Sequence, residues 1–426
     1  PKERRFSPTK EEVSWGKHLV MNEIKRCKPK VVIVHDKKIF DYLCNYTINV
    51  KDAKGGWFSV LDTGIPLYLC NPAYKLITQP WTAEQFMVDL REVSRMVFGI
   101  KRHPVVAEDY RTISTIEQLR DLVSEWKAGG FRRFSVDCEW GGSVFLDGRL
   151  RSIQFCWAPG KAAYLRFFDH EGTPHLGAEI ATGAGGLDVP IHPNQSVCEG
   201  EAYINYELVG EILGSYLNEE GAEYIGHHCA ADFPWMRHWL NLETYRRCYM
   251  DTEYGLQTLD EYAPLGLEQV AMRYTDFGRY DMELVMWKRE NKLGDGDGYA
   301  KIPDDILIPY ALKDVDAPFR ATPAIVEELQ RQDLWTYFCK ILRPFVADVF
   351  TEFSYYGLPV DRELFEKTRA FMNWAHRQLL VQFRIDLCVE ADKDLQETFH
   401  FDEGLATLQG WRTKGDLKAV TRACSA

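Results

Sequence analysis

The chain contains 426 residues, 46% of them hydrophobic and 27% charged, and carries a formal net charge of −12. These values are typical of a globular protein with two or three domains and exclude a disordered or fibrous chain. No apolar run reaches the roughly 18 to 20 residues of a membrane helix, and the first residues lack the order of a signal peptide, so we expect a non-secreted, intracellular protein. Position 1 is Pro rather than Met, and we expect the chain to be a piece of a longer one.

The positions of the cysteines and charged residues indicate which kinds of metal site and cross-link to expect. The 11 Cys include no C-x-x-C pair, which argues against a structural zinc site and against a disulfide framework. We expect reduced thiols, with Cys138, Cys156 and Cys229 buried in apolar stretches. Residues 1–54 hold 13 Lys and Arg against 7 Asp and Glu, so the rest of the chain is strongly acidic. Such an acidic main part of the chain is compatible with a site in which bound cations supply the local positive charge.

The first segment of the chain, residues 1–103, has an α/β pattern with few strands. Helical periodicity and short apolar runs alternate in it, at 17–27, 31–34, 65–70 and 81–98. His103-Pro104 and the polar residues after it mark a domain boundary, and Ser114 is the expected cap of a helix over 115–126. We therefore place a second domain at 104–333. A third region, 334–426, has a helical pattern as far as 387 with a turn at 356–359.

The second domain opens with a strand meander. Three apolar stretches separated by Gly-containing turns, at 131–140, 150–157 and 162–168, predict strands joined by hairpins. Residues 169–200 are rich in Gly, Pro and Asp and predict a long loop. A helix, a strand and a helix are predicted at 203–217, 224–228 and 232–240, and a further helix at 304–332, bent or broken by Pro309 and Pro318. This order predicts an α/β domain with a mixed sheet flanked by helices, the layout of a ribonuclease-H-like domain.

Two carboxylates stand two residues apart in the first of these strands. Asp137 and Glu139 belong to the strand-like run 134–140. Because side chains alternate along a strand, both carboxylates point to one face. Two like charges on one face repel each other, and a divalent cation would compensate them. A D-x-E pair by itself is equally compatible with an ordinary strand.

Two later elements carry further candidate ligands. Asp232 follows the predicted strand at 224–228 and stands near the start of a helix, where an Asp is most often only a cap. Tyr310 and Asp314 are four residues apart on the late helix, so a phenol and a carboxylate share one helix face. Each pattern is common in isolation, and the informative feature is their order along the chain.

Taken in order, D-x-E on a first strand, G-H-x-x-x-x-D after a later strand and Y-x-x-x-D on a late helix resemble the DEDDy class of 3′ to 5′ exonucleases, over roughly 105–330. The resemblance implies that four carboxylates hold two divalent cations, Mg²⁺ or Mn²⁺, which activate water and neutralise charge on the scissile phosphate. These carboxylates are Asp137, Glu139, Asp232 and Asp314. It also implies that Tyr310 orients the attacking water. A tyrosine pKa near ~10 favours positioning over proton abstraction at neutral pH.

One position departs from the family pattern. His228 stands where these enzymes usually have Asn, four residues before the second-motif Asp, and the resemblance implies that it helps to hold the substrate end or the motif loop. Trp140 and Phe233 are further candidate substrate contacts because aromatic rings can stack on bases, although such residues more often belong to the core.

Three other acidic residues are rival ligands. Asp251 stands at a strand-to-helix junction, where a cap is the expected role, and Asp260 follows it on the same stretch. Asp316 is two residues past Asp314 and leaves the helix face that carries Tyr310. We therefore prefer the four motif carboxylates.

The flanking segments also resemble known families. Residues 342–350 and the following Tyr-Gly-Leu-Pro-Val-Asp at 356–361 are similar to the junction between exonuclease and thumb in family A (Pol I-like) DNA polymerases. In residues 1–103, the stretches 29–34 and 64–74 resemble part of a family 4 uracil-DNA glycosylase, with Asn71 in place of the usual His. Half of that fold, including its water-activating motif, is missing, so we expect a packing domain rather than base excision.

These resemblances imply a metal-dependent exonuclease that acts on single-stranded or frayed DNA 3′ ends as the proofreading part of a family A-like polymerase. It would be encoded by a bacterium or a phage and located in the cytoplasm or at the nucleoid. The implied partners are the DNA 3′ end and a palm and fingers region, on the rest of the polypeptide or on a separate chain, and no membrane. Two alternatives stay open: an RNase D-like enzyme that trims RNA, which shares the three motifs, and a non-catalytic DNA-binding module.

Overall fold

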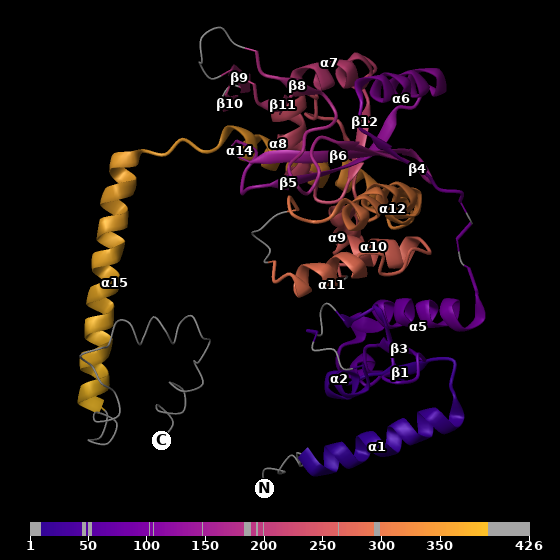
Figure 1. The fold of residues 1–426 in the computed structure, drawn as a ribbon. Coiled ribbons are helices and arrows are strands. Elements are labelled where there is room, and N and C mark those ends of the chain that lie inside the picture. Colours follow the sequence, from indigo (N-terminus) through magenta and orange to yellow (C-terminus); the bar gives the residue numbers. More distant parts are fainter. Residues whose placement is uncertain are drawn as a thin grey trace. The chain divides into compact units, whose positions relative to one another are not determined.

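The computed structural model describes residues 10–44, 48–49, 53–101, 103–104, 106–146, 148–182, 189–192, 195–198, 200–262, 264–293 and 299–390 (Figure 1). By its internal packing the chain divides into two units, Pro1–Tyr356 and Gly357–Ala426. Within the described residues, no helix combines the length and the apolar character needed to cross a membrane. The described cysteines are free thiols, and Cys138, Cys156 and Cys229 are buried as predicted.

The first hundred residues form a small α/β part of the first unit. Among its described residues, the α-helices are α1 (Lys10–Cys27), α2 (Lys37–Cys44), α4 (Lys75–Thr78) and α5 (Ala83–Phe98), and the strands are β1 (Val32–Val34), β2 (Trp57–Ser59) and β3 (Pro66–Leu69). The central strand β3 is parallel to β1 and antiparallel to β2. The helices and strands predicted in this segment are confirmed. Its apolar core also takes in Met282 and Met286, which belong to α11 (Met282–Glu290), far along the chain.

A six-stranded mixed sheet forms the centre of the remaining part of the first unit. In spatial order it contains β13 (Cys248–Asp251), β12 (Glu223–Gly226), β5 (Arg133–Gly141), β6 (Arg149–Ala158), β7 (Lys161–Arg166) and β4 (Asp109–Ile113). Strand β6 is antiparallel to both neighbours, and the other neighbouring pairs are parallel. The predicted meander is therefore confirmed, and the domain has the predicted ribonuclease-H-like α/β fold.

Helices cover both faces of this sheet (Figure 1). On one face lie α6 (Ile116–Gly129), α7 (Tyr206–Leu217) and α8 (Cys229–Leu240), which share a core with Phe134, Val136 and Cys138 of β5. On the other face lie α9 (Thr252–Leu259), α10 (Leu267–Tyr274) and α12 (Asp304–Arg331). Because side chains alternate along β5, Asp137 and Glu139 face α12.

The structure differs from the sequence-based expectations in the stretches that lack apolar runs. The polar stretch before residue 114 forms β4, since pairing at the sheet edge uses the backbone and needs no continuous apolar run. Thr115, not Ser114, caps α6, because Thr115 and Gln118 form a reciprocal capping box.

The predicted loop at 169–200 contains three short strands instead, one of which pairs with a strand just after this stretch. Strand β8 (Ala178–Ile180) pairs with β11 (Ala202–Ile204), and β9 (Val189–His192) pairs with β10 (Gln195–Val197). Positions 183–188, 193–194 and 199 of the predicted loop lie outside the described residues. Short strands of three or four residues carry too little periodicity to stand out from a polar, Gly-rich sequence.

Helix α12 runs unbroken from Asp304 to Arg331 although it contains Pro309, Pro318 and Pro323, so the predicted break does not occur. A proline inside a helix costs about 3 kcal/mol. Pro309 is exposed, so the carbonyl group one turn earlier can bond to water. The helix also buries a long face against the sheet and against α9 and α10, and each large side chain buried there contributes ~1.5–3 kcal/mol. Burial therefore outweighs the local cost.

The chain continues in helical form after α12, as predicted. Short helices α13 (Trp335–Tyr337) and α14 (Phe350–Tyr356) flank two π-helical segments, Phe338–Leu342 and Pro344–Val349. The second unit, by itself, consists of α15 (Arg362–Glu390) among the described residues. The remainder of the predicted helical region, 391–426, lies outside the described residues.

Candidate active site

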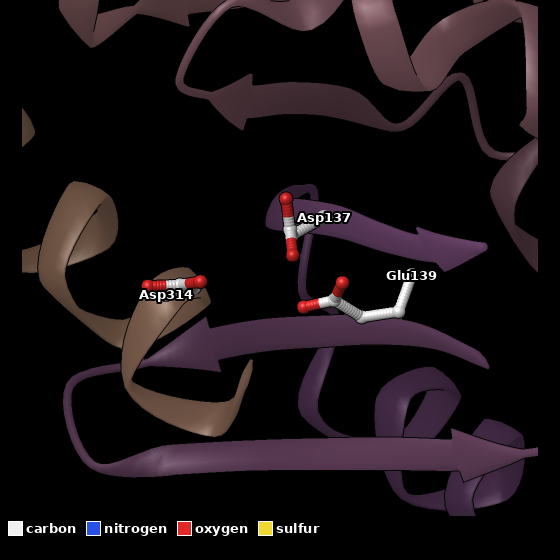
Figure 2. Close-up of side chains that lie close together, drawn as sticks. All are labelled: Asp137, Glu139 and Asp314. Carbon is white, nitrogen blue, oxygen red and sulfur yellow. The ribbon is translucent and has the colours of Figure 1, made fainter. Parts of the chain in front are cut away.

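Three carboxylates meet where β5 faces α12. An oxygen atom from each of Asp137, Glu139 and Asp314 lies within 4.8 Å of the others. Figure 2 shows the three side chains turned toward a common centre, two from the strand and one from the helix. Glu139 and Asp314 are buried and Asp137 is partly buried. We refer to these three residues as the acidic cluster.

Burial and mutual repulsion raise the pKa of every carboxyl group in the acidic cluster. Loss of hydration is the main cause for all three groups. The second cause is the charge of a neighbouring carboxylate. The charge of Asp232 raises the pKa of Asp137, and the charge of Asp137 raises the pKa of both Glu139 and Asp314. A divalent cation would remove this conflict, and carboxylate oxygens are the ligands that Mg²⁺ and Mn²⁺ prefer. The residues present therefore fit a hard divalent metal ion.

Asp232 lies beside the acidic cluster without belonging to it. Its buried side chain stands in the first turn of α8 and accepts a hydrogen bond from the backbone N–H of Cys138, at 3.1 Å. Its negative charge raises the pKa of both Asp137 and Glu139. The structure thus brings the fourth motif carboxylate to the same strand that carries the first two.

A row of tyrosine rings borders the acidic cluster. The ring of Tyr310 stacks on Tyr280, with centroids 5.9 Å apart, and on Tyr299, with centroids 6.2 Å apart. The hydroxyl group of Tyr280 donates a hydrogen bond to Oδ1 of Asp314. Burial raises the pKa of Tyr310, so its hydroxyl group keeps its proton and can donate a hydrogen bond.

Tyr280, Lys288 and Tyr299 were missed in the sequence because they belong to no motif. The Nζ atom of Lys288 lies 3.8 Å from the centre of the Tyr299 ring. The positive charge of Lys288 offsets a small part of the rise in the pKa of Glu139. The backbone N–H of Tyr299 donates to the carbonyl of Trp140, at 3.0 Å, which ties this segment to the end of β5. The only signal in the sequence was the frequency of Tyr and Trp between 274 and 299.

His228 occupies a special backbone position. It precedes α8 in the left-handed conformation, with φ +65° and ψ +50°, which Asn, Asp and His tolerate better than most residues. A His can therefore replace the Asn of the family pattern without new backbone strain. Its Nδ1 atom lies 2.8 Å from Glu253, which raises the pKa of His228. The side chain is half exposed and has this contact with α9 rather than with the acidic cluster.

The two aromatic candidates lie in different environments. Phe233 is fully buried and packs on Tyr224, so its position favours a role in the core over contact with a substrate. Trp140 is partly exposed, and its ring stacks on Trp235 with centroids 4.9 Å apart. Trp140 therefore remains a candidate for contact with a substrate base.

The rival acidic residues have structural partners. Asp251 accepts hydrogen bonds from the first turn of α9, as predicted for a cap, and also from the backbone of Cys229. Asp260 accepts from the N–H of Tyr262. Asp316 is buried and binds the Tyr110 hydroxyl group and Arg320, away from the acidic cluster.

Similarity to known proteins is limited in extent. No protein-family model matches the chain. The chain is similar to the DNA polymerase of Escherichia phage T5, with 30% identity over an alignment of 158 residues; the match covers 33% of this chain and 18% of that polymerase. The chain therefore spans only a small share of that relative.

Several solved nuclease structures share part of the fold. They include Brucella melitensis NrnC bound to pGG, with 12% identity, 61% of this chain and 98% of that chain covered, and a TM-score of 0.36. They also include the Trypanosoma brucei RNase D: GMP complex, with 14% identity and a TM-score of 0.38. That match covers 59% of this chain and 66% of the RNase D chain. Such low scores support no conclusion about function, which must come from the site itself.

Proposed function

We propose that this chain is a metal-dependent 3′ to 5′ exonuclease that hydrolyses phosphodiester bonds at 3′ ends. The observation that carries the proposal is the acidic cluster, in which Asp137, Glu139 and Asp314 come within 4.8 Å of one another from distant parts of the sequence. Asp232 lies against the same strand, and Tyr310 stands one turn before Asp314. An ordinary core would not gather buried like charges in this way, because each is costly without a counter-charge.

The proposed role of each residue follows from its position. Two divalent cations, Mg²⁺ or Mn²⁺, would be held by Asp137, Glu139, Asp314 and Asp232. When bound, such cations neutralise charge on the phosphate and activate water. Tyr310 keeps its proton, and its hydroxyl group can hold the attacking water or a phosphate oxygen in position.

We further propose that the substrate is single-stranded or frayed DNA and that the role is proofreading. The partial similarity to a phage DNA polymerase supports this proposal, as does the resemblance of 356–361 to the junction before a polymerase thumb. In this view residues 1–103 are a packing domain, 104–333 the nuclease and 334–426 the start of a polymerase-like region. The palm and fingers would lie on the rest of the polypeptide or on a partner chain. His228 and Trp140 would contact the terminal nucleotides, with Trp140 offering its ring to a base.

The test is cleavage of one single-stranded oligonucleotide labelled in turn at its 5′ and 3′ ends, in Mg²⁺. We expect a ladder of shortened products from the 5′ label and immediate release of mononucleotide from the 3′ label. Both should disappear in EDTA and in Asp137→Ala, Glu139→Ala. Asp305→Asn, an exposed carboxylate on the same helix as Asp314, is the matched control and should cleave normally.

The outcome also separates the alternatives. Intact DNA in the wild-type reaction, under all metal conditions, would contradict the proposal and favour a binding module. The same sequence as RNA, cleaved in parallel, decides the substrate: faster shortening of RNA than of DNA would favour the RNase D-like alternative.

A further inference from the structure

The small N-terminal α/β part packs against the segment that carries Tyr280. The carbonyl group of Lys54 accepts a hydrogen bond from Arg279, whose buried guanidinium also forms a two-point ion pair with Asp281, with both N–O distances at 2.7 Å. The next residue, Gly55, has φ +76°, and a Cβ atom there would lie 3.2 Å from Cγ of Arg279. The turn at 53–56 therefore fixes the residue that precedes Tyr280.

Helix α11 continues this connection toward the acidic cluster. Its first turns place Met282 and Met286 against the apolar core of the N-terminal part. Its last turn carries Lys288, which lies over the ring of Tyr299 and whose charge acts on Glu139. One short helix thus belongs to the N-terminal core at its beginning and to the border of the acidic cluster at its end.

We propose that the N-terminal part positions a metal ligand through Tyr280. Docking of the turn 53–56 on Arg279 holds the phenol of Tyr280 on Asp314 and so fixes the orientation of that carboxylate for metal binding. Tyr280 is then a positioning residue, and residues 10–98 act as a brace for the acidic cluster. The inference rests on the proposed metal-dependent function and adds to it a role for the N-terminal part.

The expected size of the effect follows from the behaviour of groups that hold metal ligands in place. Loss of such a partner typically weakens metal affinity by about 10- to 100-fold. Tyr280 donates the hydrogen bond and has no charge of its own, so we expect the lower end of that range. The turn 53–56 acts one step further away, and its disturbance should weaken affinity by a smaller factor, on the order of 3-fold.

The test measures Mn²⁺ affinity from the paramagnetic resonance signal of free Mn²⁺, with the whole chain and without nucleic acid. Tyr280→Phe should raise the dissociation constant about 10-fold. Tyr110→Phe is the matched control, because it removes a phenol-to-aspartate hydrogen bond from the same helix, at Asp316, and should leave the constant within about 2-fold. An unchanged or tighter affinity in Tyr280→Phe would overturn the inference.

A second pair of variants tests the role of the N-terminal part. Gly55→Val places a side chain against Met272 and Arg279, whereas Gly64→Val introduces a similar backbone strain, at φ +67°, with no atom within 4 Å of its Cβ. Only Gly55→Val should weaken Mn²⁺ binding. Equal Mn²⁺ dissociation constants for the two variants would refute the proposed role of the N-terminal part in positioning Asp314. Arg279→Lys, which keeps the charge beside Asp281, replaces Gly55→Val if that variant does not fold. Absence of Mn²⁺ binding by the wild type would instead contradict the proposed function itself.

Discussion

The acidic cluster should lower the stability of the metal-free protein, and Asp314→Asn tests this directly. Two charges at 4.8 Å, the upper limit of the separations in the acidic cluster, repel each other by about 3.5 kcal/mol at an effective dielectric constant of ~20. Asp314 has two such neighbours, but burial and the charge of Asp137 raise its pKa and so favour the uncharged, protonated form, which has no charge to repel. We therefore expect Asp314→Asn to raise the free energy of unfolding by about 1–3 kcal/mol without metal.

The assay is thermal and urea unfolding of wild type and variant, in EDTA and in excess Mn²⁺. Because the entropy of unfolding grows with chain length, at about 2.1 cal/mol/K per residue, each kcal/mol should raise the Tm of this 426-residue chain by about 1 °C. At a Mn²⁺ concentration about 1,000 times the Kd of the wild type, metal binding adds about 4.1 kcal/mol to the stability of the wild type. This gain exceeds the expected advantage of the variant, which has lost a ligand, so the order of stability should reverse.

The pH dependence has a definite sign. The folded-state pKa of the Asp314 carboxyl group is raised, so the folded state binds more protons than the unfolded state. The wild type should therefore lose stability as pH rises from about 4, the ordinary Asp value, toward the raised value. The advantage of Asp314→Asn in EDTA should grow over the same range. A variant less stable than the wild type at neutral pH in EDTA would refute the reasoning and indicate that the hydrogen bond from Tyr280 already stabilises the Asp314 carboxylate.

Three other substitutions address the phenol, a core aromatic ring and the half-exposed imidazole. Tyr310→Phe should slow cleavage by about 100-fold or more in single-turnover assays while the Tm stays close to that of the wild type, and an unchanged rate would contradict its positioning role. Phe233→Ala should lower the free energy of urea unfolding by about 3–5 kcal/mol, because it leaves a cavity in a fully buried position; a loss below about 1 kcal/mol would argue for a surface role. Glu253 raises the pKa of His228, so the protonated imidazole stabilises the folded state at low pH and this contribution is lost as pH rises through the raised value. The stability of the wild type relative to His228→Asn should thus fall from about pH 6.5 upward, whereas a difference independent of pH would show that the ion pair contributes nothing.

The parts of the candidate site that could be located from the sequence are those tied to a periodicity. Asp137 and Glu139 share a face because a strand repeats every two residues, and Tyr310 and Asp314 share one because a helix brings i and i+4 together. Tyr280 could not be found in this way. It is 34 residues from Asp314, in a turn before α11, and its position depends on contacts with the N-terminal part.

The fold shows the same division between local and long-range causes. The long strands and helices were predicted because their apolar patterns extend over many residues. The polar edge strand β4 and the short strands between 178 and 204 were missed because backbone pairing with distant partners creates them. The continuity of α12 through three prolines likewise depends on a buried face that no local propensity describes.

The site combines two kinds of scaffold, and they differ in how freely they can be redesigned. The carboxylates of the acidic cluster stand on the central strand β5 and on the long helix α12, where any shift of the backbone would disturb the core of the domain. Tyr280, Lys288 and Tyr299 come from the connecting segment between α10 and α12. Outside the apolar face of α11, which packs on the N-terminal core, this segment can vary in sequence with less cost to folding. An engineer who wished to change what the site accepts, while keeping its metal chemistry, would therefore substitute residues of this segment and retain Tyr280, Arg279 and the contact with the carbonyl of Trp140.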